Sequence, residues 1–193
     1  PCQIYTAKRK GKGWDDPKLL PLAPDSFTVG HPSVSTDNMQ LFFISNMEGG
    51  YGGKDVWVSN YDKKKKEWQT PVNLGPEVNT TGDEMFPFIR GDGTLYFSSN
   101  GHIGMGGLDN FKATLDGEKW GNVTNLKYPM NSAGDDFGII FEGKADRGYF
   151  TSNRKGGKGG DDIYYFVSPQ LTFTLQGVVI DADTRAVLIE ATV

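Results

Sequence analysis

The feature of this sequence that most constrains its fold is an internal repeat. Three Ser-Asn pairs occur 54 and 53 residues apart, and each asparagine is followed nine residues later by an aspartate. An aromatic residue lies two positions after each aspartate, and an aromatic pair lies shortly before each Ser-Asn pair. The repeated polar residues are Asn46 with Asp55, Asn100 with Asp109, and Asn153 with Asp162. Self-similarity at a fixed period indicates stacked copies of one supersecondary unit.

Short runs of aromatic and β-branched residues, bounded by Gly, Asp and Asn, predict four strands in a complete unit. Asp92-Gly93 and Asp116-Gly117 predict tight hairpin turns, and no segment has the pattern of a helix. Strands are expected at 32–35, 41–45, 56–59 and 72–74, at 87–90, 95–99, 110–113 and 123–126, and at 138–141, 148–152 and 163–166. Four short strands repeated at about 50 residues predict an all-β fold, a β-propeller of four-stranded antiparallel blades.

The expected strands are unevenly distributed between the two ends of the repeat region. Residues 1–22 supply only the last two strands of a blade, and residues 136–167 supply only the first three. We therefore expect residues 1–168 to form propeller blades in an incomplete ring, and the sequence to be a fragment of a longer protein. Aromatic residues, 12% of the chain, would fill the space between adjacent blades.

The repeat stops after residue 168. Residues 171–180 largely alternate apolar and polar positions, and a polar turn at 181–184 leads into a second apolar segment. We expect residues 171–193 to form the first strands of a β-sandwich. The segment Gly177-Val-Val-Ile-Asp-Ala-Asp-Thr184 resembles the opening of carboxypeptidase regulatory-like domains, which are small β-sandwiches.

One unit of the repeat also resembles a known class. The stretch Asp92-Gly-Thr-Leu-Tyr-Phe-Ser-Ser-Asn100, followed by Gly106-Gly-Leu-Asp109, is similar to the PD40 class of WD40-like propeller repeat in TolB-type proteins. The Gly-Gly-x-Asp loops and the sandwich segment together resemble OmpA-family envelope proteins of Bacteroidota, which include type IX secretion system components. This resemblance implies a non-enzymatic scaffold, periplasmic and associated with the outer membrane, whose partners are other envelope or secretion-system proteins. It implies peptidoglycan binding only through a C-terminal domain to which no residue of this sequence belongs.

Charge and cysteine content exclude several function classes. The 20 basic and 24 acidic residues give a net charge of -4, so no basic excess favours nucleic acid as a partner. The single cysteine, Cys2, excludes an internal disulfide and a zinc site built from cysteines. No apolar run approaches the roughly 20 residues of a membrane-spanning helix, so no direct membrane span is expected. The glycine loops lack the spacing of phosphate-binding motifs, and no cofactor is expected.

The repeated asparagines and aspartates allow two interpretations. Oxygen-rich loops bind hard cations, so each set could form a calcium site or a site with a catalytic carboxylate. Alternatively, these side chains could satisfy backbone groups of the loops, as Asx turns do. An active site needs one copy, whereas the set recurs three times, and the spacing of a calcium-binding EF-hand loop is absent. The structural role is favoured, and no metal site is expected.

Known catalytic motifs are absent from the sequence. Neither Gly-x-Ser-x-Gly nor His-Glu-x-x-His occurs, and the segment at Ser35 lacks the glycine and tryptophan of sialidase boxes. His31 stands where other repeats carry Phe86 and Phe137, so a packing role is expected for it. The basic run Lys63–Lys66 is interpreted as a solvated hairpin tip, with electrostatic docking to an acidic partner or to an anionic envelope surface as the alternative.

One face of the predicted ring remains as a functional candidate. In propellers, the loop after the outermost strand and the loop between the second and third strands open on the same side. We expect this face to bind a peptide or protein, because loops on a rigid scaffold are common binding sites. The alternative is a glycan-binding or glycan-processing propeller, which in its enzymatic form needs two carboxylates about 5 to 9.5 Å apart. The expected face residues are Tyr51, Asp83, Glu84, His102, Asp135, Asp136, Arg154 and Lys155.

Overall fold

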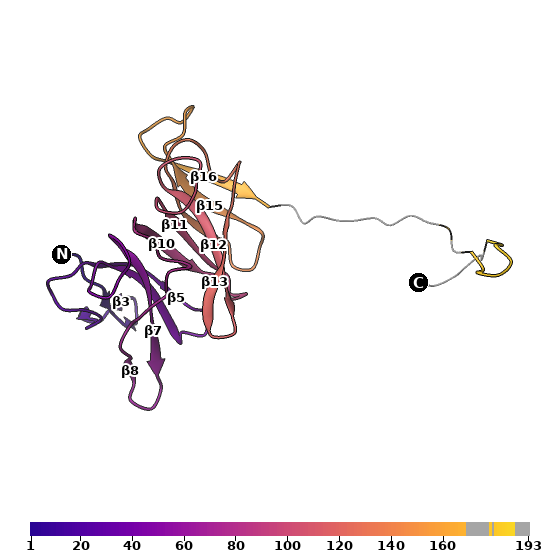
Figure 1. The fold of residues 1–193 in the computed structure, drawn as a ribbon. Helices are drawn as coiled ribbons and strands as arrows, with labels where there is room; N and C mark the ends of the chain where they lie inside the picture. Colours follow the sequence, from indigo (N-terminus) through magenta and orange to yellow (C-terminus); the bar gives the residue numbers. More distant parts are fainter. Residues whose placement is uncertain (169–177, 179, 188–193) are drawn as a thin grey trace.

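The structure is a computed structural model that describes residues 1–168, 178 and 180–187. Every regular element in these residues is a β-strand, and all strand pairings are antiparallel (Figure 1). The prediction of an all-β chain is confirmed. No helix in the described part of the chain could cross a membrane.

Three main sheets follow one another along the chain and share one strand order. The first sheet contains β5 (Val29–Val34), β6 (Gln40–Ser45) and β7 (Asp55–Asp62), with β8 (Glu67–Trp68) and β9 (Val72–Asn73) both paired to β7. The second sheet contains β10 (Glu84–Ile89), β11 (Leu95–Ser99), β12 (Asp109–Asp116) and β13 (Lys119–Asn125). The third sheet contains β14 (Asp136–Phe141), β15 (Arg147–Ser152) and β16 (Asp162–Val167).

The N-terminal segment repeats the outer part of a sheet. β1 (Tyr5–Thr6) pairs with β4 (Lys18–Leu19), much as β7 pairs with β9. β2 (Arg9–Lys10) pairs with β3 (Gly13–Trp14), much as the end of β7 pairs with β8. These are the two outer strands expected for residues 1–22, with a small hairpin between them.

The C-terminal segment is described only in part. Residues 171–177, 179 and 188–193 of the expected β-sandwich hairpin lie outside the described residues. In the described part, Ile180 and Val187 form an antiparallel bridge around a polar turn. The Asp181 carboxylate accepts hydrogen bonds from the backbone N–H groups of Asp183 and Thr184, at 3.0 and 2.7 Å. The turn lies where the sequence predicts it, and the sandwich stays a prediction.

A β-bulge interrupts the first strand of each main sheet. The pairing register shifts at the same place in β5, β10 and β14. The bulge residue has a positive φ: 48° for His31, 53° for Phe86 and 67° for Gly138. The bulge corrects the sequence alignment, because Gly138 rather than Phe137 is the counterpart of His31 and Phe86. The first strands begin two or three residues earlier than expected, because pairing continues on both sides of the bulge.

Apolar side chains between consecutive sheets form the core. One cluster joins the N-terminal segment to the first sheet around Phe43. A second cluster lies between the first and second sheets and includes Phe42 and Phe97. A third lies between the second and third sheets and includes Tyr96 and Phe150. The first and second sheets are therefore covered on both faces, and this packing fixes the loops at the sheet ends.

Candidate interaction face

The repeated aspartates hold the glycine loops in place. In each main sheet, the loop between the second and third strands folds back over the aspartate near the start of the third strand. Two successive loop N–H groups donate to each carboxylate, over 2.6 to 3.2 Å. The donors are Tyr51 and Gly52 for Asp55, Met105 and Gly106 for Asp109, and Lys158 and Gly159 for Asp162. This is the backbone-satisfying role that the threefold recurrence favours.

The repeated asparagines fix the entrance to the first strand. The side-chain oxygen of each accepts a hydrogen bond from the residue that precedes the first strand of its own sheet. The donors are the backbone N–H of Thr28 to Asn46 at 2.8 Å, of Asp83 to Asn100 at 2.8 Å, and of Asp135 to Asn153 at 2.7 Å. Each asparagine therefore ties the end of the second strand to the beginning of the first.

Two acidic residues expected on the open face are buried inside the sheets. The side chains of Glu84 and Asp136 are both 0% exposed. Glu84 accepts hydrogen bonds from Thr80 and Ser99, and Asp136 accepts them from Ser132 and Arg154, all over 2.6 to 2.8 Å. The expected binding face therefore does not include these two carboxylates, because internal donors saturate them.

Asp83 and Asp135 connect consecutive sheets. The Asp83 carboxylate accepts a bond from Lys54 Nζ at 3.2 Å, and the Asp135 carboxylate accepts one from the backbone N–H of Leu108 at 2.8 Å. Backbone bonds run beside them, from Glu84 N to Lys54 O at 2.7 Å and from Asp136 N to Leu108 O at 2.6 Å. The first strand of one sheet is thus bonded to the glycine loop of the preceding sheet.

His102 and Arg154 occupy equivalent places in the second and third sheets. His102 Nε2 lies 2.8 Å from the carbonyl of Val78, and Arg154 Nη2 donates to the carbonyl of Met130 at 3.2 Å. Both carbonyls belong to the connection that arrives from the preceding sheet. The Arg154 guanidinium also lies 5.0 Å from the ring centre of Phe150, a favourable cation–π arrangement. These two side chains bond the glycine loops of their own sheets to the connections from the preceding sheets, which is a structural role.

Two buried asparagines, Asn79 and Asn131, bond the backbone of a strand, a role that the sequence does not predict. Asn79 accepts a bond from Val56 N at 2.8 Å and donates to Val56 O at 3.0 Å. Asn131 makes the same pair of bonds with Asn110, at 2.8 and 2.9 Å. Each amide takes the place of a strand partner at the edge of the sheet. The sequence shows that Asn79 follows Trp68 at the same spacing as Asn131 follows Trp120. It does not show the bonds that these asparagines make.

The part of the loop face that remains open to solvent includes large apolar side chains. Ile103 is 96% exposed, and Tyr51 and Met105 are also exposed. Lys155 lies exposed on the equivalent loop of the third sheet. Among the described residues, no group of three or more His, Cys, Asp or Glu side chains is arranged to hold a metal ion. The geometry therefore offers a surface for contact with another molecule, and the four acidic residues expected on this face are engaged in internal bonds.

His31 lies where the first strands of two sheets meet. Its ring stacks on Phe86 with 4.1 Å between ring centres, and Phe86 stacks on Phe137 at 4.9 Å. The backbone N–H of Phe86 donates to His31 Nδ1 at 3.2 Å, which requires that this nitrogen carries no proton. Burial, and to a smaller degree the charge of Lys54, lowers the pKa of His31. The packing role expected for this histidine is what the structure shows.

Acidification is expected to weaken the junction at His31. The folded-state pKa of His31 lies below the unfolded value of about 6.5, so the unfolded chain binds the proton more readily. Neutral His31 makes its full contribution to the free energy of unfolding above the unfolded-state pKa. This contribution is lost as the pH falls from there towards and through the folded-state pKa. Urea unfolding near pH 7.5 and near pH 5.5 would measure this, comparing the chain with His31→Asn.

Asparagine is a suitable replacement because it accepts a hydrogen bond, tolerates a positive φ and does not titrate. We expect the loss of stability between the two pH values to be smaller in His31→Asn. An equal loss in both proteins would show that His31 is not the group responsible.

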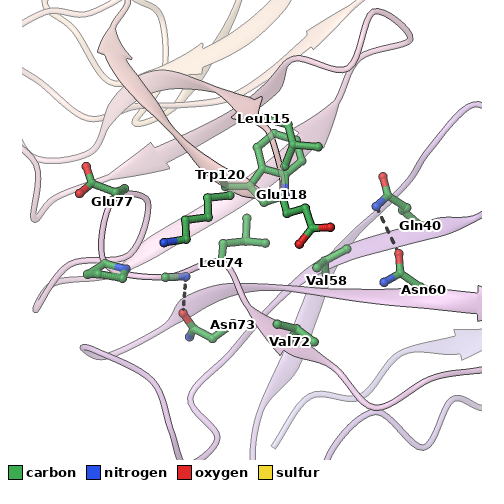
Figure 2. A pocket seen from close by; sticks show the side chains of 13 residues that line it. Gln40, Val58, Asn60, Val72, Asn73, Leu74, Glu77, Leu115, Glu118 and Trp120 are labelled. Carbon is green, nitrogen blue, oxygen red and sulfur yellow. Dashed lines mark hydrogen bonds between the residues drawn. The ribbon is translucent and has the colours of Figure 1, made fainter.

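A groove of about 590 Å³ lies between the first and second sheets, away from the loop face (Figure 2). Trp120 and Leu115 form one side, and Leu74 and Val58 lie across from them. Its other labelled residues are Gln40, Asn60, Val72, Asn73, Glu77 and Glu118. None of the residues expected on the loop face lines this groove.

Comparison with known proteins adds information on the fold. No family model matches the chain, and no curated protein matches it. A solved luciferin-regenerating enzyme is similar over 87% of this chain and 52% of its own, with 15% identity and a TM-score of 0.52. A puromycin-hydrolyzing peptidase of Mycobacterium tuberculosis is similar over 89% of this chain and 30% of its own, with 17% identity and a TM-score of 0.52. The chain spans about half of the first protein and less than a third of the second. Likeness at this identity concerns the fold alone.

Proposed function

We propose that this chain is part of a β-propeller that serves as a non-enzymatic protein-interaction scaffold. The repeated strand order and the packing of consecutive sheets face to face support the propeller. The first strands of neighbouring sheets also lie together: Ile89 N donates to Ser33 Oγ at 3.1 Å, beside the stacked rings of His31 and Phe86. Such contact between first strands is expected when sheets are arranged around a common axis.

The scaffold role is supported mainly by the acidic residues expected on the loop face, which are buried or bonded within the protein. Glu84 and Asp136 are 0% exposed, and Asp83 and Asp135 are bonded to protein donors. No observation favours the glycan-processing alternative, which needs a pair of carboxylates free to act on a substrate. The exposed apolar side chains, Ile103 foremost, are instead typical of a contact surface on a rigid support.

The proposed location is the bacterial envelope. The PD40-like segment and the resemblance to OmpA-family proteins support a periplasmic protein associated with the outer membrane. Its partners would be other envelope or secretion-system proteins, and a type IX secretion system is the assembly that the resemblance favours. Contact with peptidoglycan would require a separate C-terminal domain.

A pull-down from the envelope fraction of the source bacterium tests the scaffold role. Ile103→Asp combined with Met105→Asp should lose the captured proteins, because two charges then stand in the apolar contact surface. Leu115→Asp is the matched control, since Leu115 is exposed on the hairpin between β12 and β13, away from these loops. It should retain the proteins that mass spectrometry identifies with the unchanged chain. Equal capture by the loop variant would contradict the proposed face, and hydrolysis of a glycan or peptide that one carboxylate variant abolishes would contradict the scaffold.

A further inference from the structure

Two hairpins concentrate the positive charge of this chain. The hairpin between β7 and β8 has Lys63–Lys66 at its tip, and all four lysines are exposed. Residues 8–18 and 62–67 together hold nine of the 20 basic residues and four of the 24 acidic ones. The remaining chain holds 11 basic and 20 acidic residues. In and beside the hairpin between β2 and β3, the exposed cations are Lys8, Arg9, Lys10 and Lys12.

The two hairpins occupy equivalent places in consecutive units of the repeat. Arg9 pairs with Trp14 as Tyr61 pairs with Trp68. The N-terminal segment packs against the first sheet, so equivalent parts of the two units lie at the same end of the molecule. The corresponding hairpin of the second sheet differs, because residues 116–119 hold two acids and one lysine. Two neighbouring hairpin tips therefore form one basic surface, which we call the hairpin end.

The hairpin end lies opposite the loop face. β7 begins at Asp55, beside the glycine loop, and ends at Asp62, beside the lysines. Its eight residues separate these two positions by roughly 25 Å, the length of an extended strand of that size. In Figure 1 the hairpin at β8 projects beyond the body of the first sheet. Both faces of this sheet are packed, so the exposure of the lysines does not depend on an uncovered sheet face.

Acidic side chains at this end are occupied by hydrogen bonds. Asp62 Oδ1 accepts bonds from two backbone N–H groups of the hairpin, at 2.8 and 3.0 Å. Asp37, in the turn between β5 and β6, accepts a bond from Ser35 Oγ at 2.6 Å. Within the described structure, the one ion pair formed by the eight cations joins Lys65 to Glu67, at 3.9 Å and with both side chains largely exposed. The other cations are available to a partner.

The kind of cation indicates the kind of partner. Seven of the eight are lysines, and Arg9 is the exception. The lysine ammonium is a flexible, strongly hydrated point charge, whereas single carboxylates and phosphates are typically bound by the forked hydrogen bonds of arginine. Lysines spread over two hairpins suit a broad anionic surface better than a small ligand. Clusters of roughly four to eight basic residues are typical of segments that bind anionic lipids.

We propose that the hairpin end docks on a membrane surface that contains anionic lipids, with the lysines of both hairpins near the lipid phosphates. The attraction is electrostatic and requires no inserted segment. The acidic excess of the remaining chain favours the approach of this end over others. The loop face then points away from the membrane and is free to contact proteins. This inference goes beyond the proposed scaffold function and does not depend on it.

Sedimentation of the full chain with lipid vesicles tests the docking. The vesicles contain phosphatidylcholine and phosphatidylglycerol at about two to one, and vesicles of phosphatidylcholine alone are the reference. The chain should bind the mixed vesicles at low salt and dissociate as salt rises, because ions screen the attraction. Lys63→Glu with Lys66→Glu should weaken binding at least about tenfold, since each basic residue near an anionic surface contributes about fivefold. Lys10→Glu with Lys12→Glu should have a similar effect.

The matched control is Lys127→Glu with Lys158→Glu. It changes the net charge by the same amount as either hairpin variant. Both lysines are exposed, one just after β13 and the other in the glycine loop of the third sheet, away from the hairpin end. This variant should bind the mixed vesicles nearly as well as the unchanged chain. Urea unfolding of all variants shows that each is folded.

Four results would overturn the proposal. They are the absence of binding to the mixed vesicles at low salt, equal binding to phosphatidylcholine alone, equal losses in the control and hairpin variants, and tighter binding of the hairpins to polyglutamate or duplex DNA than to the vesicles. In the last case the partner would be an acidic protein or a nucleic acid. Ile103→Asp with Met105→Asp should leave vesicle binding nearly unchanged. Failure of the scaffold role in the pull-down and failure of lipid docking are therefore seen in separate measurements.

Discussion

Arg154→Ala is expected to lower the free energy of unfolding by roughly 3–5 kcal/mol, because it leaves a buried carboxylate without its cation. Arg154 Nη2 lies 2.6 Å from Asp136 Oδ1, with side-chain exposures of 18% and 0%. The same guanidinium donates to the carbonyls of Pro129 and Met130, at 2.8 and 3.2 Å. One substitution thus removes the bonds that join the third loop to the connection from the second sheet. Urea unfolding followed by circular dichroism measures the change.

Arg147→Ala is the matched control for this experiment. Arg147 pairs with Glu142 at 2.7 Å, but the arginine side chain is 54% exposed, so solvent screens the pair. The free energy of unfolding should stay nearly unchanged. Adding Asp136→Asn to Arg154→Ala should recover part of the lost stability, since it removes the uncompensated charge. Equal losses for the two arginines would contradict a structural role for Arg154.

Asn131→Ala is expected to lower the free energy of unfolding by about 2–4 kcal/mol, because it leaves the buried N–H of Asn110 without an acceptor. Asn131 is fully buried and bonds both the N–H and the C=O of Asn110, as well as the side chain of Asn125 at 2.9 Å. Alanine removes all three bonds and leaves a small cavity. The equivalent substitution Asn79→Ala should have a similar effect between the first and second sheets.

Asn60→Ala provides the comparison for the buried asparagines. The Asn60 side chain is exposed and accepts a bond from Gln40 at 3.2 Å. Its loss should change stability far less than the loss of Asn131, as measured by urea unfolding of both variants. Comparable effects would mean that the buried amides do not act as strand partners.

The sequence predicts most of the strands because their signals are local. In runs such as 95–99, successive side chains pack alternately against the two neighbouring sheets, and Asp-Gly pairs predict the turns. Local propensity and packing therefore favour the same structure. The roles of Asp55 and its equivalents also follow from the sequence, since recurrence at fixed spacing favours loop stabilisation over chemistry. Both predictions depend on residues close to one another in the chain.

The features that the sequence does not predict depend on distant partners. Glu84 and Asp136 look like surface acids, and their burial depends on donors such as Ser99 and Arg154 that lie 15 and 18 residues away. The same bulge occurs in β5, β10 and β14, and the strand pairing matches His31 and Phe86 with Gly138 rather than with Phe137. Asn131 illustrates the same limit, because its spacing is visible but the backbone it bonds is 21 residues away.

The backbone bonds that link each first strand to the preceding glycine loop also affect how the molecule opens. Glu84 N and Asp136 N are each bonded to a carbonyl of another sheet, so loosening one sheet removes a bond from its neighbour. Stability in such an array is shared between nearest neighbours. Among the described residues, the second sheet contacts both the first and the third sheet, whereas the third contacts the second. Loosening of the third sheet should therefore remove bonds from the second sheet as well.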